Sequence, residues 1–191
     1  MDRQDRLRIA HDNGFRYEAE YRGCAQCTVA AIQDALGLHE ETVFRAATSL
    51  GGGIGKAGDG VCGAYCGAAI MIGYIWGRER KRFNGERHNL DVAYDLTNRY
   101  HDWMIGEYGG CLCREVQESI FGRSFDLWNQ KDKQRFEEAG AHRDKCPEVV
   151  GRGAAKAVEM ILEEMERQDI ALSVLEPLEC DGEHSSKVKE P

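Results

Sequence analysis

The sequence lacks the features that mark several large classes of protein. No stretch approaches the ~20 consecutive apolar residues that a bilayer span requires. Residues 1–6 are of mixed charge with no apolar segment behind them, which predicts no signal peptide and a cytoplasmic protein. Basic residues are fewer than acidic ones, 25 against 33, and the net charge is −8. This balance disfavours nucleic-acid binding and binding to anionic membranes.

Several cofactor-binding patterns are missing as well. Covalent haem attachment needs Cys-x-x-Cys-His, whereas Cys27 is followed by Thr28. A phosphate-binding loop needs Ser or Thr after Gly-Lys, but Lys56 is followed by Ala57. The closely spaced cysteine runs of ferredoxins do not occur, and neither do the two Cys-x-x-Cys pairs of a typical four-cysteine zinc site. The spacing of the cysteines alone therefore does not choose a metal.

Helical periodicity is present along most of the sequence, with no convincing alternation of apolar and polar residues. The 191 residues, 42% of them apolar, are enough for one domain with a real hydrophobic core. We predict an all-α helical bundle over residues 1–174 and a polar C-terminal tail over residues 175–191. The helices are expected over residues 14–36, 39–50, 61–76, 90–108, 111–122, 131–139 and 146–167.

A glycine-rich loop is predicted at residues 51–60, where six of the ten residues are glycine. Such a segment must turn tightly or come close to another group. The helix after it is apolar on all sides and holds several small residues, which favours a buried central position. Glycine backbone can also approach a metal–sulfur cluster and donate N–H groups to it. The candidates for this cofactor-binding role are Gly53, Gly55, Gly60 and Gly63.

Seven of the eight cysteines lie at positions related to predicted helices. Cys24 and Cys27 are three residues apart, and Cys62 and Cys66 are four apart, so each pair shares a helical face. In a cytoplasmic protein, metal ligation or redox chemistry explains such cysteines better than disulfides do. Cys180, in the predicted tail, is expected to be a plain thiol. The candidate metal ligands are Cys24, Cys27, Cys62, Cys66, Cys111, Cys113 and Cys146.

Three of these thiols, Cys62, Cys113 and Cys146, lie near predicted helix starts, where the helix dipole lowers the pKa of a thiol. The thiolate is both the metal ligand and the nucleophile. Cys24, in contrast, is expected inside a helix with no strand before it, which argues against a thioredoxin-like site. Imidazole is also a metal ligand, but His88, His101 and His142 lie in polar, charged segments and are expected at the solvated surface or at helix caps.

The segment 59–68, Asp-Gly-Val-Cys-Gly-Ala-Tyr-Cys-Gly-Ala, together with the glycines before it, resembles the centre of the C-GCAxxG-C-C family of redox proteins. The flanking segments agree in order. Residues 23–26 resemble the family's first cysteine, residues 113–115 its third and residues 146–150 its last. The likeness spans residues 22–163, and it implies an all-helical redox protein typical of anaerobic bacteria and archaea.

The resemblance extends to the split-Soret cytochromes, in which a similar domain holds an iron–sulfur cluster within a dimer. It implies a homodimer that exchanges electrons with a redox partner protein or a small molecule, without the haem. By this likeness the cluster ligands are Cys24, Cys62, Cys113 and Cys146. Beside each of the first three of these positions the sequence has one additional cysteine: Cys27, Cys66 and Cys111. These additional thiols are either further cluster ligands, which we favour, or a dithiol relay next to the metal.

Three functions remain open at this point. The first is an iron–sulfur redox protein that transfers electrons, with catalysis requiring an iron open to substrate. The second is a metal-free dithiol/disulfide oxidoreductase that uses Cys24 with Cys27, or Cys62 with Cys66. The third is a zinc-stabilised interaction module. An iron–sulfur protein is coloured whereas the other two are colourless, so a visible spectrum separates them.

Overall fold

The structure of the protein, a computed structural model, describes residues 1–84 and 87–172. These residues form eight α-helices and no strand, apart from an isolated bridge between Val61 and Leu112. The predicted all-α class is therefore confirmed. The predicted boundary at residue 174, the C-terminal tail and Cys180 lie outside the described residues. Among the described helices, none is long and apolar enough to cross a membrane.

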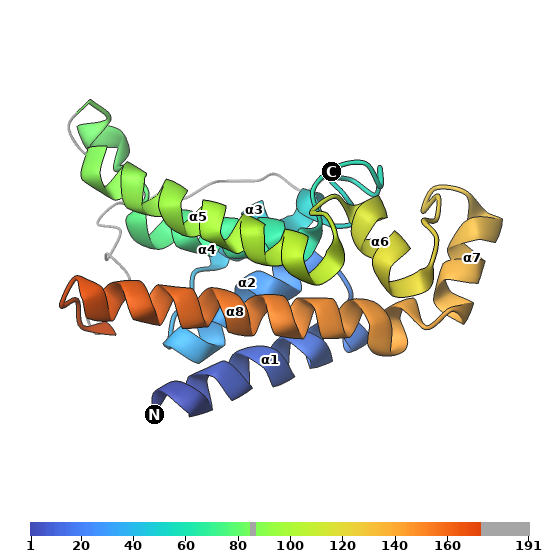
Figure 1. Ribbon diagram of the computed structural model, residues 1–191, viewed down its shortest axis with the longest axis horizontal. Coiled ribbons are helices and arrows are strands. Elements are labelled where there is room, and N and C mark those ends of the chain that lie inside the picture. The colour runs from blue at the N-terminus through green and yellow to red at the C-terminus, as the bar shows by residue number, and fades with distance from the viewer. Residues whose placement is uncertain (85–86, 173–191) are drawn as a thin grey trace, which may run out of the picture.

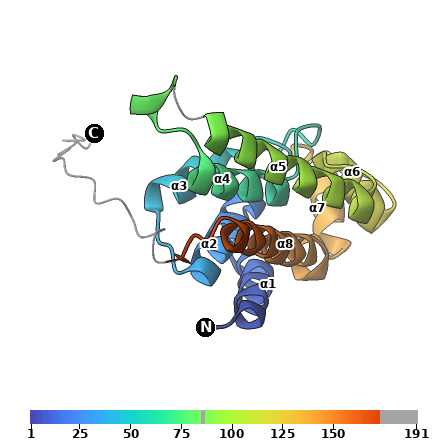
Figure 2. The ribbon, with the colours of Figure 1, turned by 60° about the vertical axis from the view of Figure 1, so that its left-hand side comes forward.

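The helices pack in layers around α8. Figure 1 shows α1 and α8 side by side in opposite directions, with α6 and α7 gathered at one end of the molecule. Figure 2 looks nearly along α8 and places α4 and α5 on the side of α8 opposite to α1. A π-helical turn, Ala141–Lys145, directly precedes α8. The helix bounds are α1 Arg3–Glu20, α2 Cys24–Leu36, α3 Glu41–Ala46, α4 Gly63–Trp76, α5 Arg87–Tyr108, α6 Cys113–Phe121, α7 Gln130–Glu138 and α8 Cys146–Arg167.

The single helix predicted over residues 14–36 is wrong, because two helices, α1 and α2, occupy this region. The chain turns between them at Arg22 and Gly23, whose φ angles are 64° and 95°. Two residues in this left-handed region cannot continue a right-handed helix. Cys24 is therefore the first residue of α2 and does not lie inside a longer helix.

The other predicted helices are present, with shifted ends. The helix expected over residues 39–50 is shorter, because α3 ends at Ala46 and the chain continues as the 3-10 turn Thr48–Leu50. The central position of α4 is confirmed. A Cβ on its Gly67 would lie 2.6 Å from the carbonyl oxygen of Ala25 in α2, so only glycine allows this close crossing.

Two hydrophobic cores of unequal size hold these helices together. The larger core is built by α1, α2, α4, α5 and α8, and it includes the fully buried side chains Ile32, Met71, Leu96, Tyr100 and Ile161. The smaller core joins Phe121, Phe125 and Phe136, whose ring centroids lie 5.4 Å apart in each pair. Cys146 packs against the smaller core, so the start of α8 lies where the two cores meet.

Candidate functional site

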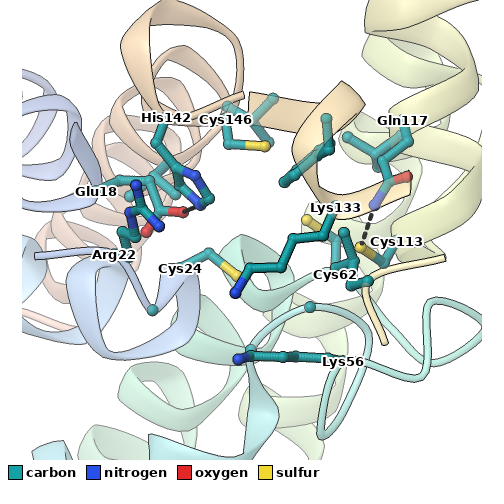
Figure 3. A pocket seen from close by; sticks show the side chains of 18 of the residues that line it. Glu18, Arg22, Cys24, Lys56, Cys62, Cys113, Gln117, Lys133, His142 and Cys146 are labelled. Atoms are coloured by element: carbon teal, nitrogen blue, oxygen red, sulfur yellow. Dashed lines mark hydrogen bonds and ion pairs between the residues drawn. The ribbon is translucent and has the colours of Figure 1, made fainter. Parts of the chain in front are cut away.

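A cavity of about 400 Å³ lies where the larger and smaller cores meet. Its size is typical of a pocket for a small molecule or cofactor. Figure 3 shows four cysteine side chains around this space. They come from four separate segments of the chain and all line the cavity: Cys24, Cys62, Cys113 and Cys146. We call this space the cysteine cavity.

Each of the four cysteines stands at the start of a helix. Cys24 is the first residue of α2, and Cys62 is the N-cap residue of α4. Cys113 and Cys146 are the first residues of α6 and α8. The helix starts expected at Cys62, Cys113 and Cys146 are therefore present, and Cys24 provides a fourth. The first N–H groups of a helix have no partner within the helix, so such positions suit an electron-rich ligand.

Backbone hydrogen bonds fix the starts of α4 and α6 relative to each other. The N–H of Cys62 donates to the carbonyl of Cys111 at 2.8 Å, and the N–H of Cys113 donates to the carbonyl of Gly60 at 2.9 Å. These bonds flank the isolated bridge between the two segments. The two helices therefore begin from one junction, which places Cys62 and Cys113 together on the wall of the cysteine cavity.

The glycine-rich loop forms a compact turn at the edge of the cysteine cavity. Residues 52–56 have positive φ angles of 60° to 74°. Hydrogen bonds of 2.7 to 3.2 Å tie the loop to itself and to the preceding turn. Ile54 and Lys56 adopt this left-handed conformation without being glycine, at a cost of roughly 1–2 kcal/mol each. Strain of this kind is maintained only where surrounding contacts determine the backbone.

Glycine is required at two points where the backbone passes a cysteine. A Cβ on Gly63 would lie 2.1 Å from Sγ of Cys24, and a Cβ on Gly53 would lie 2.8 Å from Cβ of Cys113. Any side chain at residue 63 would therefore displace the Cys24 thiol. Of the four glycines expected near a cofactor, Gly55 lines the cavity. The other three are not part of its lining: Gly53, Gly60 and Gly63.

Burial keeps the cavity thiols protonated when no positive charge compensates them. It raises the pKa of the Cys62 thiol to about 12, although the first N–H groups of α4 act in the opposite direction. Burial also raises the pKa of Cys113, and those of Cys24 and Cys146 lie well above the ordinary value. The prediction that helix starts lower these pKa values is wrong, because lost hydration outweighs the helix dipole. A bound metal would supply the missing positive charge.

Gln117 of α6 connects the Cys113 thiol to the smaller core. Its Nε2 donates to Sγ of Cys113 at 3.3 Å, and its Oε1 accepts from the N–H of Phe125 at 2.8 Å. The side chain is buried, so these bonds are shielded from water. Both ends of the amide are occupied, and this fixes the direction of the N–H donor toward sulfur. The sequence pattern did not identify this residue.

A buried carboxyl, Glu18 of α1, also lines the cysteine cavity. It is 2% exposed, and within the described part of the chain its Oε2 has no hydrogen-bond partner. Its Oε1 lies 3.7 Å from Nε2 of His142, whose Nδ1 lies 2.9 Å from a carboxylate oxygen of Glu137. Burial raises the pKa of Glu18 to about 7, against the opposing effects of a hydrogen bond with Cys27 and the charge of Arg22. The carboxyl therefore exchanges its proton near neutral pH.

Sequence analysis missed Glu18 and misplaced His142. The imidazole of His142 is half-buried, lines the cysteine cavity and packs edge-on against Phe136 at 5.6 Å between ring centroids. A signal for Glu18 exists, because Ala10, Gly14 and Glu18 are the buried residues of α1 and repeat every four positions. A carboxyl on this face of small residues has to be buried against α8, since Gly14 contacts the α8 backbone.

The three cysteines beside the family positions do not line the cysteine cavity: Cys27, Cys66 and Cys111. The thiol of Cys27 donates to the carbonyl of Arg22 at 3.2 Å, and the thiol of Cys66 donates to the carbonyl of Val61 at 3.8 Å. Burial raises the pKa of all three thiols. The structure therefore gathers four of the seven predicted ligands around one space and places the other three outside its wall.

The four cavity cysteines are buried thiols, the donor type that zinc and iron–sulfur clusters both take in proteins. Within residues 1–84 and 87–172, no three histidine, cysteine or acidic side chains are grouped closely enough in this structure to hold a metal ion.

Comparison with known proteins identifies a family. Residues 23–160 match the sequence model of C_GCAxxG_C_C, described as "Putative redox-active protein". This range contains the four cavity cysteines and the whole glycine-rich loop. No curated protein and no solved structure matches the chain. Because the match covers well over half of its length, the chain belongs to the C_GCAxxG_C_C family of putative redox-active proteins.

Proposed function

We propose that the protein binds an iron–sulfur cluster through Cys24, Cys62, Cys113 and Cys146 and transfers electrons through it. One observation carries this proposal: four thiols from four helix starts, spread over residues 24–146, line a single cavity. A buried cysteine can serve as a small apolar side chain, but that role gives no reason for four of them to face one space. Membership of a redox-active family supports a redox role.

The bound cluster supplies a centre that gains and loses one electron at a time. The protein's own residues hold it and control its surroundings. Gln117 donates to the sulfur of Cys113, and such hydrogen bonds raise the reduction potential by stabilising the more negative state. Glycine at residue 63 leaves room for the sulfur of Cys24. Apolar side chains that limit access of water line the same cavity: Val116, Val149 and Val150.

The geometry gives less support to a metal-free dithiol oxidoreductase. Its disulfides would join Cys24 to Cys27 or Cys62 to Cys66. In each pair the first thiol lines the cysteine cavity, whereas the second is not part of its lining and donates to a backbone carbonyl. The two members of each pair thus face different surroundings, which disfavours their reaction as a dithiol.

Purification without oxygen tests the proposed function. The visible spectrum should show broad absorption, and iron and acid-labile sulfide should be present in near-equal amounts per chain, with little zinc. The protein should also lose its colour when the iron is removed by a chelator. A colourless protein with eight titratable thiols and no bound iron, even after anaerobic reconstitution, would overturn the proposal. Zinc in place of iron would contradict it equally.

A further inference from the structure

Two lysines line the cysteine cavity without a role in holding the cluster. Lys56 belongs to the glycine-rich loop and Lys133 to α7. Figure 3 shows the side chain of Lys133 extending into the space between the thiols and that of Lys56 lying below them in the view. Among residues 1–84 and 87–172, neither ammonium group has an ion-pair or hydrogen-bond partner. The lining also holds the carboxyl groups of Glu18 and Glu137, but their ion-pair partners are Arg22 and His142 and not these lysines.

Lys133 has a carboxylate close by in sequence but does not pair with it. Glu137 follows one turn later on α7, at the spacing of a helical ion pair. Among the described residues its carboxylate forms its ion pairs instead with Nη1 of Arg22 at 3.1 Å and with Nδ1 of His142 at 2.9 Å. Lys133, a half-buried residue, therefore keeps its ammonium group available to a ligand in the cavity.

Lys56 is held in place by an unusual backbone conformation. Its φ angle is 64°, in the left-handed region that glycine occupies most readily. Its N–H donates to the carbonyl of Gly51 at 3.1 Å, which fixes this turn of the loop. Most neighbouring residues of the loop are glycine, so a lysine here retains strain that a seventh glycine would remove. Strained residues of this kind occur preferentially at functional sites.

The wall near these lysines is apolar. It is supplied by α6, α7 and the segment between them, and its side chains are Ile120, Leu127, Trp128 and Phe136. This apolar wall adjoins the thiols, because Leu127 and Cys146 both pack against the smaller core. An apolar wall with a few convergent charges is typical of a site for a small amphipathic molecule. Ammonium groups form their strongest hydrogen bonds with anionic oxygens, such as those of a carboxylate.

We propose that the cysteine cavity binds a small organic carboxylate, with the carboxylate held by Lys56 and Lys133 and the apolar part against α6 and α7. This inference rests on the proposed function, since it names the class of small molecule that would meet the cluster. The carboxylate site can nevertheless be tested separately from the cluster, because the lysines and the apolar wall are present whether or not the thiols hold iron.

Benzoate is a suitable probe, with benzamide as its neutral isostere. Calorimetric titration of the iron-loaded protein should show saturable binding of benzoate, at least about tenfold tighter than that of benzamide. Lys133→Gln and Lys56→Gln should each weaken benzoate binding about tenfold and leave benzamide unchanged. Lys131→Gln is the matched control, because Lys131 lies on the same helix but does not line the cavity. It should change neither affinity.

Equal affinities for benzoate and benzamide would overturn the inference, as would an equal loss in the Lys131 and Lys133 variants. Circular dichroism shows whether each variant is folded, and Lys133→Gln decides the matter if the strained loop does not tolerate Lys56→Gln. Iron and sulfide are measured on every sample before titration. A protein without iron that still binds benzoate through these lysines would contradict the proposed function and support this inference. An iron-loaded protein that does not bind benzoate would support the proposed function and contradict this inference.

Discussion

The larger and smaller cores make different contributions to the cysteine cavity. The larger core packs five helices around fully buried side chains, and it positions the starts of α2 and α4 with Cys24 and Cys62. The smaller core rests on three phenylalanines and covers the opposite side of the cavity, next to Cys146. The comparison indicates that the larger core provides most of the stability, whereas the smaller core determines how the site is closed.

The largest expected effect separates cysteines that line the cavity from those that do not. Cys62→Ser should abolish the visible absorption and most of the bound iron, because serine is a poor ligand for iron in a cluster. Cys66→Ser is the matched control on α4, since this thiol donates to a backbone carbonyl outside the cavity lining. Iron analysis of both variants checks the prediction. Equal losses of iron in the two variants would mean that Cys66 is also a ligand and that the cluster has more than four cysteine ligands.

The next largest effect is a pH dependence of stability caused by Glu18, the buried carboxyl that lines the cavity. The pKa of Glu18 is raised from 4.5 to about 7, so between these values the folded state keeps a proton that the unfolded state releases. The free energy of unfolding of the metal-free protein should therefore fall as pH rises through this range, by about 3 kcal/mol in total. Urea unfolding at several pH values measures this fall.

Glu18→Gln should remove most of that pH dependence and increase stability above pH 7. Glu41→Gln replaces an exposed carboxyl on α3 and should leave the pH dependence as it is. An unchanged fall in the Glu18 variant would show that Glu18 does not hold this proton.

A smaller effect should distinguish two glycines of the same helix. Gly63→Ala forces a methyl group against the Cys24 thiol, and overpacking of this kind costs about 1–3 kcal/mol. Gly73→Ala meets no atom within 4 Å and should be neutral or stabilise α4 by up to about 1 kcal/mol. Urea unfolding and iron content of the two variants test this difference. Equal destabilisation would show that α4 tolerates no alanine, irrespective of the cysteine.

The smallest expected effect is on the redox potential. Gln117→Leu removes the hydrogen bond to the sulfur of Cys113, which is worth about 1 kcal/mol and corresponds to a few tens of millivolts. The potential should become more negative, because the reduced centre loses a stabilising donor. Gln134→Leu, an exposed position on α7, should leave the potential unchanged. Protein electrochemistry measures both, and a shift toward positive values in the Gln117 variant would contradict the prediction.

Local signals in the sequence predicted much of the fold. Cys146-Pro147 correctly predicted the start of α8, and the run of glycines correctly predicted a loop before α4. The break before Cys24 was missed, because Arg22 shares the left-handed conformation with Gly23 and residue type alone does not report this. The π-helical turn before α8 has no sequence signal that we can identify.

The site was predictable only in part, for a different physical reason. The four cysteines could be selected by their likeness to a family motif, although spacing alone left seven candidates open. The residues that complete the wall are set by long-range packing. Glu18, Gln117 and Lys133 come from three helices, and no local pattern relates them. The raised thiol pKa values likewise depend on burial, which single-sequence reasoning does not measure.

The spread of the four thiols along the chain has a consequence for biosynthesis. At ribosomal rates of about 5–20 residues per second, roughly 6–25 seconds separate the synthesis of Cys24 from that of Cys146. During this interval the early thiols lack the wall that later buries them, and they are open to oxidation. α8, which begins at Cys146, then packs against α1, so the beginning and the end of the described fold meet last. The cysteine cavity is therefore complete only when almost the whole described fold has been made.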